Sequence, residues 1–184
     1  MKSIIIICFL ILFCGANIII AQVYIPTDNG SSIMFIIKNL GFNVDGSFKN
    51  LQGNINFDPG NLKSSVFKVT VDAATVNTGN KSRDSHLKKE EYFNVTEYPT
   101  ISFLSDKIEK DAGPGMYVVN GKFTVKGKSK IISIPFTAAP QNDGYLFTGK
   151  ITLNRRDFDV GGNSFVLSDN LTLKINVFAQ KGKN

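Results

Sequence analysis

The sequence predicts an all-β domain in which eight antiparallel strands close into a barrel. Two observations carry this prediction. Apolar and polar residues alternate at a period of two along most of the chain, and turn-forming segments separate the alternating runs. A closed meander has no sheet edges, and a barrel of this size has room inside for packed side chains or one small ligand. A two-sheet sandwich satisfies the same alternation, so both architectures remain open at this point.

The strands are predicted from runs in which every second residue is apolar or small. In the first run, Ile33, Phe35 and Ile37 alternate with Met34, Ile36 and Lys38. The later runs are residues 44–48, 55–57, 67–73, 101–103, 119–125, 132–136, 147–153 and 171–177. Together we interpret these nine runs as parts of an eight-stranded barrel, with one face of each run turned toward a common interior.

Turn chemistry marks the joints between the runs. Gly, Asn, Asp or Pro occurs in each of the segments 50–53, 58–60, 112–115, 126–128 and 142–144. These residue types accept a positive φ or fix φ for a turn. We therefore expect most strands to be linked by short hairpins, and residues 160–163 to form a loop.

One polar stretch, residues 82–93, interrupts the alternation between Ala73 and Pro99. Ser82 is suited to cap a short helix with Asp84 in its first turn. Leu87 and Tyr92 or Phe93 would be its apolar contacts. Because the connection is too long for a hairpin, we predict a short helical lid that crosses one end of the barrel.

The first 21 residues have the pattern of a secretory signal peptide. Lys2 is followed by a continuous apolar run over residues 4–13 and then by the small residues Gly15, Ala16 and Ala21. We expect cleavage after Ala21, which would leave 22–184 as the mature domain in the periplasm or outside the cell. Cleavage after Ala16 is the alternative, and a retained anchor is another because residues 4–21 could nearly span a bilayer.

Composition narrows the classes of partner. The chain contains 15 Phe, 13 of them after residue 21, and no Trp, so a large area of aromatic ring must either pack a core or line a cavity. Without Lys2, the net charge of +6 falls to +5, and the basic residues are scattered. Scattered charge indicates a solvated surface, with an anionic membrane surface as the second interpretation. Export excludes nucleic acid as the expected partner.

The sequence offers little catalytic chemistry. Both cysteines, Cys8 and Cys14, fall in the N-terminal segment, so the mature chain has no disulfide, thiolate metal ligand or cysteine nucleophile. His86 is the only histidine, and a lone histidine near an acid such as Asp84 is more often structural than a base. We find no G-x-S-x-G elbow, phosphate-binding loop or metal-ligand spacing, and therefore expect no enzyme, no catalytic residue and no metal.

An ordered series of motifs resembles the YceI-like family, the bacterial polyisoprenoid-binding proteins with a lipocalin-like barrel. The resemblance covers roughly residues 22–181. The motifs are SSIMFIIKN (31–39), VDGSF (44–48), INFDP (55–59), NTG (77–79), RDSHL (83–87), EYF (91–93), YPTISF (98–103), GKFTVKG (121–127) and NRRDF (154–158). The chain departs from the family at Asn39, where a histidine is frequent, and at Asp159, where glycine is usual.

The resemblance implies an isoprenoid lipid or isoprenoid quinone bound in the barrel lumen, with no other cofactor. Apolar residues that face the interior would hold the tail, because burying hydrocarbon is favourable by about 25 cal/mol per Å². The candidate lumen residues are Ile33, Phe35, Ile37, Phe48, Val69, Val71, Ile101, Phe103, Phe123, Phe136, Ile151 and Phe158. The candidate headgroup residues at the mouth are Arg83, Asp84, His86 and Arg155, with Arg156 as an alternative to Arg155.

A second hypothesis is a structural or protein-interaction module whose interior is packed solid. In that case the phenylalanines would be core residues, and Arg83 and Asp84 would only tie the helix to the barrel. Met34 and Ile36 face away from Phe35 and could meet a partner subunit in a homodimer. A third hypothesis, in which His86 and Asp84 act as an acid–base pair on a lipid, has no visible second catalytic group.

Overall fold

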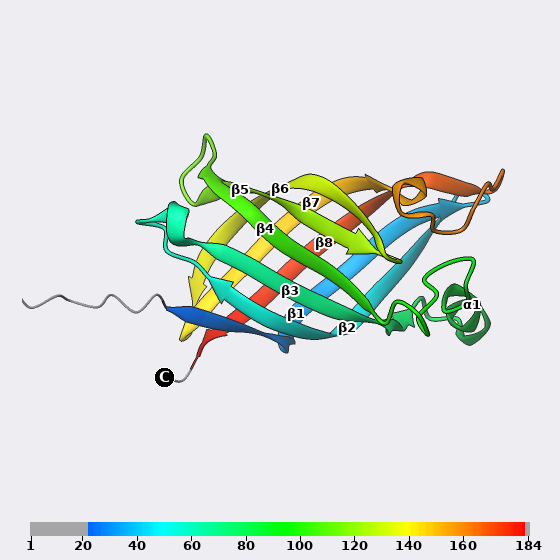
Figure 1. Ribbon diagram of the computed structural model, residues 1–184, viewed down its shortest axis with the longest axis horizontal. Helices are drawn as coiled ribbons and strands as arrows, with labels where there is room; N and C mark the ends of the chain where they lie inside the picture. The colour runs from blue at the N-terminus through cyan, green and yellow to red at the C-terminus, as the bar shows by residue number, and fades with distance from the viewer. Residues whose placement is uncertain (1–21, 183–184) are drawn as a thin grey trace, which may run out of the picture.

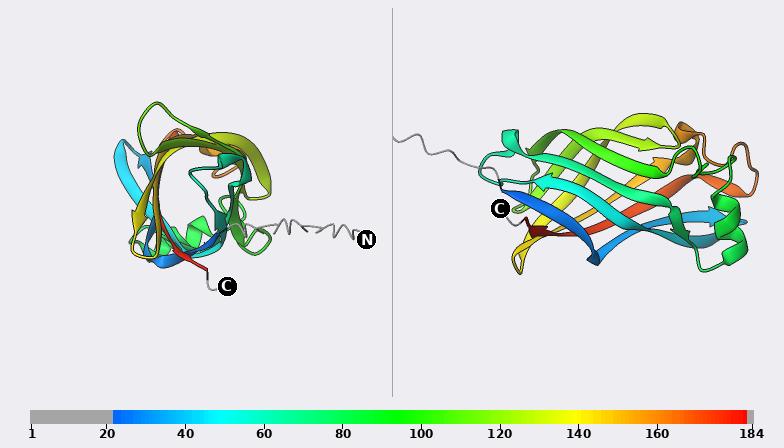
Figure 2. Two further views of the ribbon diagram at one scale, coloured as in Figure 1. Left: turned by 90° about the vertical axis from the view of Figure 1, so that its left-hand side faces the viewer. Right: turned by 60° about the horizontal axis from the view of Figure 1, so that its bottom comes forward.

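The computed structural model describes residues 22–182 and shows one closed antiparallel barrel. Its strands are β1 (Val23–Asn39), β2 (Phe42–Asn56), β3 (Val66–Asn77), β4 (Thr100–Lys110), β5 (Met116–Val125), β6 (Lys128–Gln141), β7 (Gly144–Asn154) and β8 (Leu167–Lys181). Each strand pairs with its neighbour in sequence, and β8 pairs with β1 to close the ring (Figures 1 and 2). The predicted barrel is confirmed, and the sandwich is excluded because the ladder has no break.

Tight turns join most of the strands, as the turn chemistry predicts. Lys126 and Gly127, between β5 and β6, both have positive φ, at 49° and 70°. Leu40 and Gly41, which are not among the predicted joints, connect β1 and β2 with φ of 51° and 82°. Two successive positive φ values define the turn whose twist matches that of the flanking strands.

One predicted turn is wrong. Residues 50–53 lie inside β2, so the runs 44–48 and 55–57 belong to a single strand. The register against β3 shifts between Lys49 and Gln52, and Asn50 and Gly53 have φ of 58° and 133°. These residues form a bulge in place of a hairpin, because a residue that tolerates positive φ serves either purpose. Asp28 holds the bulge by accepting hydrogen bonds from the Asn50 and Leu51 N–H groups, both at 2.9 Å.

The lid segment contains the helix α1 (Lys81–Leu87), followed by turns that lead to β4. Its N-cap is Asn80 and not Ser82, since the Asn80 side chain accepts from the Arg83 N–H at 3.1 Å. Leu87, Tyr92 and Phe93 are partly buried against the core, as predicted. No helix within residues 22–182 is long and apolar enough to cross a membrane.

The two ends of the barrel carry different structures (Figure 1). At one end lie the start of β1, the end of β8, the short helix η1 (Leu62–Ser64) and the β4–β5 and β6–β7 connections. At the other end lie α1, the β1–β2 turn and the segment from η2 (Arg155–Phe158) to β8. We call these the terminal end and the lid end.

Candidate ligand-binding lumen

A cavity of about 460 Å³ occupies the lid end of the barrel. This volume lies within the range of roughly 300–1,000 Å³ that is typical of small-ligand sites. The apolar wall comes from six strands, η2, the loop after it and the lid: Phe35, Ile37, Val44, Phe48, Leu87, Tyr92, Phe93, Ile101, Phe123, Val125, Leu153, Phe158, Val160, Leu167, Leu171 and Leu173. The polar side chains lie at the lid and at the adjoining strand ends: Asn39, Thr78, Asn80, Ser82, Arg83, His86 and Arg155.

A second cavity, of about 130 Å³, continues toward the middle of the barrel. The two cavities share Phe48, Ile101, Phe123 and Leu173 in their walls, so they are adjacent along one interior. The smaller cavity is lined almost entirely by apolar side chains; Thr70 and Ser102 are the exceptions. Together they form an apolar lumen with its polar groups at the lid end.

The structure brings eleven of the twelve predicted lumen residues to these cavity walls. Those on the larger cavity are Phe35, Ile37, Phe48, Ile101, Phe123 and Phe158, and those on the smaller cavity alone are Ile33, Val69, Val71, Phe103 and Phe136. The remaining residue, Ile151, packs against the core cluster and lies outside both walls. Phe158 reaches the lumen from η2 and not from a strand.

Several wall residues were not predicted. They include Val44, Val125, Leu153, Leu171 and Leu173, which lie in the predicted strand runs and share the inward parity of their neighbours. Strand parity alone could have identified them. Val160 and Leu167 lie in or beside a loop, where no periodic signal marks a side chain as inward.

Two glycines on the inner face of the barrel each lie directly beneath an aromatic ring of the lumen. Gly46 is paired with Phe35 across β1 and β2, and a Cβ at Gly46 would overlap the Phe35 ring. Gly121 pairs with Ser105 across β4 and β5, and a Cβ there would lie 2.7 Å from the Phe103 ring. Because glycine has no side chain, each ring can lie close to the barrel wall, and more of the interior stays open.

The interior at the terminal end is filled with aromatic rings, which we call the aromatic floor. Phe57 lies at its centre and contacts five other rings edge-on, with centroid distances of 5.3–6.2 Å. The members of the floor are Tyr24, Phe57, Phe67, Tyr117, Phe136, Tyr145 and Phe147. Aromatic rings therefore occupy the interior at this end, and the larger cavity adjoins the lid.

The solid interior expected of an interaction module is thus present at one end of the barrel and absent from the other. The phenylalanines divide accordingly into floor residues, such as Phe57, and wall residues, such as Phe35. Phe57 lines neither cavity, whereas the floor residues Phe67, Phe136 and Phe147 also border the smaller one.

At the mouth, Arg83 and Asp84 are tied to the barrel through Thr78. The Asp84 carboxylate accepts from the Thr78 N–H at 2.8 Å and from its hydroxyl at 2.6 Å. The Arg83 Nε donates to the Thr78 hydroxyl at 2.8 Å, and its Nη2 donates to the Thr78 carbonyl at 3.0 Å. The Thr78 bonds, with a smaller contribution from Arg83, hold the pKa of Asp84 below its ordinary value. This tie fixes α1 over the mouth.

His86 lies on the outer part of the lid. Its Nε2 is 3.5 Å from a Glu91 carboxylate oxygen, and its ring meets the Tyr92 ring edge-on at 5.0 Å. Both His86 and Glu91 are more than half exposed. The imidazole therefore borders the larger cavity from a solvated position.

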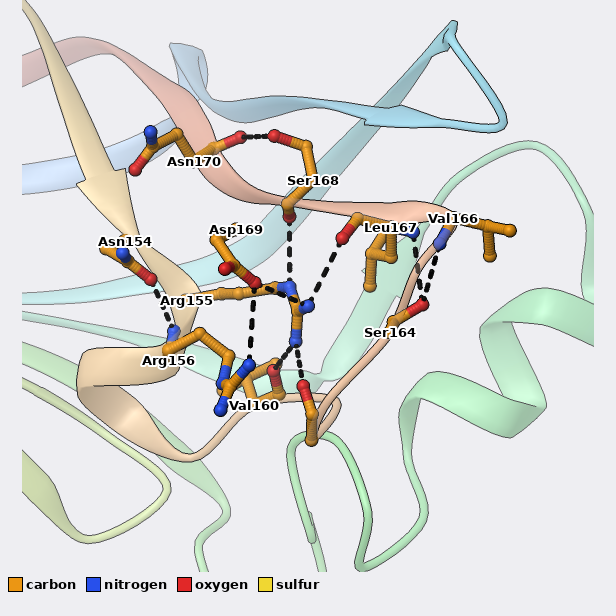
Figure 3. Close-up of polar contacts among 11 residues, drawn as sticks. Asn154, Arg155, Arg156, Val160, Ser164, Val166, Leu167, Ser168, Asp169 and Asn170 are labelled. Atoms are coloured by element: carbon orange, nitrogen blue, oxygen red, sulfur yellow. Dashed lines mark hydrogen bonds and ion pairs between the residues drawn. The ribbon is translucent and has the colours of Figure 1, made fainter.

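Arg155 is the most deeply buried charged residue at this end, with a side chain only 2% exposed (Figure 3). Its Nε donates to the Ser168 carbonyl, its Nη1 to the Val160 and Gly162 carbonyls, and its Nη2 to the Leu167 carbonyl and Asp169, at 2.8–3.2 Å. A guanidinium has five N–H groups, and all five are used. Arg155 thus organises the loop between η2 and β8, and this geometry leaves it no donor for a headgroup.

The two departures from the family pattern lie at this same end. Asn39 is the last residue of β1 and lines the larger cavity. Asp159 ends η2 with φ of 54° and ψ of 34°, the left-handed conformation that glycine adopts most easily. Its carbonyl accepts from the Lys126 ammonium at 2.8 Å, and its carboxylate pairs with Lys128 at 3.3 Å.

Among residues 22–182, no group of three or more His, Cys, Asp or Glu side chains is placed to hold a metal ion. A closed antiparallel barrel with an apolar lumen open at one end is the architecture of a small-ligand-binding barrel.

The chain belongs to the YceI-like family, whose domain model matches residues 24–179. It is 31% identical over 157 residues to a UPF0312 protein of Shewanella oneidensis, covering 81% of this chain and 82% of that protein. It is 32% identical over 135 residues to a UPF0312 protein of Ectopseudomonas mendocina, covering 70% of each chain.

Solved structures show the same barrel. BcnA of Burkholderia cenocepacia superposes with a TM-score of 0.76 at 27% identity, covering 82% of this chain and 96% of that one. The YceI protein of Campylobacter jejuni gives 0.68 at 28% identity, covering 78% and 87%. A polyisoprenoid-binding domain of Saccharophagus degradans gives 0.68 at 12% identity, covering 86% and 98%, a likeness that concerns the fold alone.

Proposed function

We propose that this protein binds an isoprenoid lipid, either a polyisoprenoid or an isoprenoid quinone, and carries it without chemical change. The observation that carries the proposal is the lumen: two adjacent cavities with apolar walls, closed by the aromatic floor and open at the lid. An extended hydrocarbon tail fits such a space because it exchanges water for apolar contacts along its whole length. The name of the Saccharophagus degradans domain supports this ligand class.

The headgroup would lie at the mouth, beside the lid. Within residues 22–182, Arg83 donates through Nε and Nη2, and its Nη1 takes part in no protein hydrogen bond. Arg83 and His86 can therefore offer donors to a carbonyl, hydroxyl or phosphate oxygen of the ligand. Asp84 would act indirectly, by holding the helix that carries both residues. Arg155 would act through the loop that it organises.

The site of action would be outside the cytoplasm. Residues 1–21, which we interpret as a signal peptide, lie outside the described part of the chain, and the proposal rests here on their sequence pattern. Isoprenoid lipids are membrane components, so a carrier in the periplasm or outside the cell would exchange its ligand with a bilayer.

Native mass spectrometry of the protein purified from its exporting host, followed by organic extraction, tests the proposal. We expect a stoichiometric mass increment that is lost on extraction, and isoprenoid fragments in the extract. A bare mass that stays unchanged after incubation with quinones and polyprenyl lipids would refute the carrier function.

A further inference from the structure

Four large apolar side chains project into solvent at the lid end of the barrel. Leu40 and Phe42 lie on the β1–β2 turn, and Phe165 and Val166 lie on the loop before β8. Phe42 is 78% exposed, and the Phe165 side chain is exposed completely. We call these four residues the mouth tips. Solvent-exposed groups of large apolar residues mark interaction sites more often than chance.

The mouth tips form one group because their two loops are hydrogen-bonded. The Leu40 N–H donates to the Val166 carbonyl at 2.8 Å, and Asn39 pairs with Leu167 in the β1–β8 ladder. Figure 1 shows the two loops together beyond the end of the barrel wall.

The same loops lead directly into the lumen. Asn39, Val44 and Leu167, which lie within two residues of the tips, line the larger cavity. Apolar surface therefore continues from the exposed tips to the interior wall.

From this continuity we infer that the mouth tips insert into the surface of a lipid bilayer and place the mouth against it. The inference rests on the proposed function, because a lipid ligand must come from a membrane. Aromatic and aliphatic side chains on an otherwise polar surface favour the boundary between headgroups and acyl chains. The isoprenoid tail would then pass from the bilayer into the lumen along apolar side chains without crossing water.

A bilayer fits the mouth tips better than a second copy of the chain does. The tips expose on the order of 500 Å² between them, less than the roughly 800 Å² per partner of a stable protein interface. They also project from two narrow loops, a shape that suits penetration of a soft surface more than packing against a flat one.

Charge is nearly balanced around the mouth, so apolar insertion provides most of the interaction. Segments 38–45, 78–98, 126–130 and 155–169 contain ten basic residues (Lys38, Lys81, Arg83, Lys88, Lys89, Lys126, Lys128, Lys130, Arg155 and Arg156) and eight acidic residues (Asp45, Asp84, Glu90, Glu91, Glu97, Asp157, Asp159 and Asp169). Two of these lysines, Lys128 and Lys130, are paired with Asp159 and Asp157. Docking should therefore occur on neutral phosphatidylcholine vesicles and depend little on salt.

Single tryptophans test the docking, because the natural chain contains none. We would compare Phe42→Trp and Phe165→Trp with Ile131→Trp, a control on β6 whose residue is 73% exposed but lies on the outer wall. With phosphatidylcholine vesicles, we expect the tryptophan emission of the two mouth probes to shift to shorter wavelength and to be quenched by brominated acyl chains. The emission of the control should show neither change.

Three outcomes would overturn the inference. The mouth probes could show no shift, which means no insertion. They could shift only with anionic vesicles at low salt, which means that docking is driven by charge. They could shift with protein concentration in the absence of vesicles, which identifies a second copy of the chain as the partner.

Ligand transfer separates failure of this inference from failure of the proposed function. In the double variant Phe42→Ser/Phe165→Ser, transfer of a short-chain ubiquinone from vesicles should slow by about tenfold or more. Equilibrium loading of the same quinone from detergent should match that of the natural chain, and Ile131→Ser should change neither. Unchanged transfer in the double variant would refute membrane docking alone, whereas absence of loading from detergent in the natural chain would refute the quinone ligand.

Discussion

The two ends of the barrel are built from the same kinds of side chain and yet have opposite interiors. At the terminal end, Phe57 contacts five neighbouring rings and lines neither cavity. At the lid end, rings such as Phe35 and Phe48 pair along the wall, with a centroid distance of 5.7 Å, and leave about 460 Å³ open. Phenylalanine content alone therefore does not decide whether a barrel is packed or hollow; the decisive feature is whether rings meet across the axis or lie along the wall.

The largest effect should come from breaking the aromatic floor. Phe57→Ala removes the ring that contacts five others, and we expect it to lower the free energy of unfolding by about 3–5 kcal/mol. Phe35→Ala, at the hollow end, should lower it by less than half as much, because one side of that ring already faces a cavity. Urea unfolding of both variants measures the difference. Equal losses would show that the two ends are packed alike.

The next effect concerns the loop that frames the mouth. Arg155→Met leaves four backbone carbonyls and Asp169 without their buried donor, and should cost about 3 kcal/mol of unfolding free energy. The matched control is Arg156→Met, which removes a 40% exposed arginine that lies 3.8 Å from the same aspartate and should cost less than about 1 kcal/mol. Similar values for the two variants, measured by thermal unfolding, would contradict the structural role of Arg155.

A smaller change in free energy is expected for ligand binding when the lumen is filled without unfolding the barrel. Leu173 faces both cavities, whereas the next residue, Lys174, faces solvent. Leu173→Trp should weaken binding of an isoprenoid quinone by about tenfold or more by occupying the lumen, and Lys174→Trp should leave it unchanged. Circular dichroism checks that both variants fold. Equal affinities for the two variants would place the ligand outside the lumen.

The smallest effect is expected from pH, and it is confined to the lid. Because the pKa of Asp84 is lowered in the folded chain, its contribution is present above the unfolded pKa of about 3.9 and is lost as the pH falls through the folded value. Hydrogen exchange of α1 amides should therefore show the lid loosening in acid while the β-strands stay protected. Asp84→Asn should remove this pH dependence, and an unaltered profile would show that another group controls the lid.

The sequence predicts the barrel and most of the lumen wall because both depend on the two-residue period of a strand. Whether Phe103 or Val71 points inward is decided by its immediate neighbours in the chain, and that information is local. The aromatic floor was not predicted, because it depends on contacts between residues as distant as Phe57 and Tyr145. The structural role of Arg155 could not be predicted for the same reason. Most of its hydrogen-bond partners are backbone carbonyls, which the fold brings together and which no sequence pattern marks.

Turn residues mark the limit of local prediction in another way. Asn50 and Gly53 carry the signal of a hairpin but form a bulge, since the strand on either side continues to pair with β3. The N-cap of α1 is predicted at Ser82 but lies two residues earlier, at Asn80. Both residue types are good N-caps, so the sequence alone does not decide which of the two begins the helix.

Calorimetric titration with isoprenoid quinones that share one headgroup and differ in tail length tests the central claim most directly. If the tail lies in the lumen, affinity should rise with each added carbon by up to about fourfold and reach a plateau once the space above the aromatic floor is full. An affinity that is independent of tail length, or equal to that of the headgroup alone, would show that the lumen does not hold the ligand.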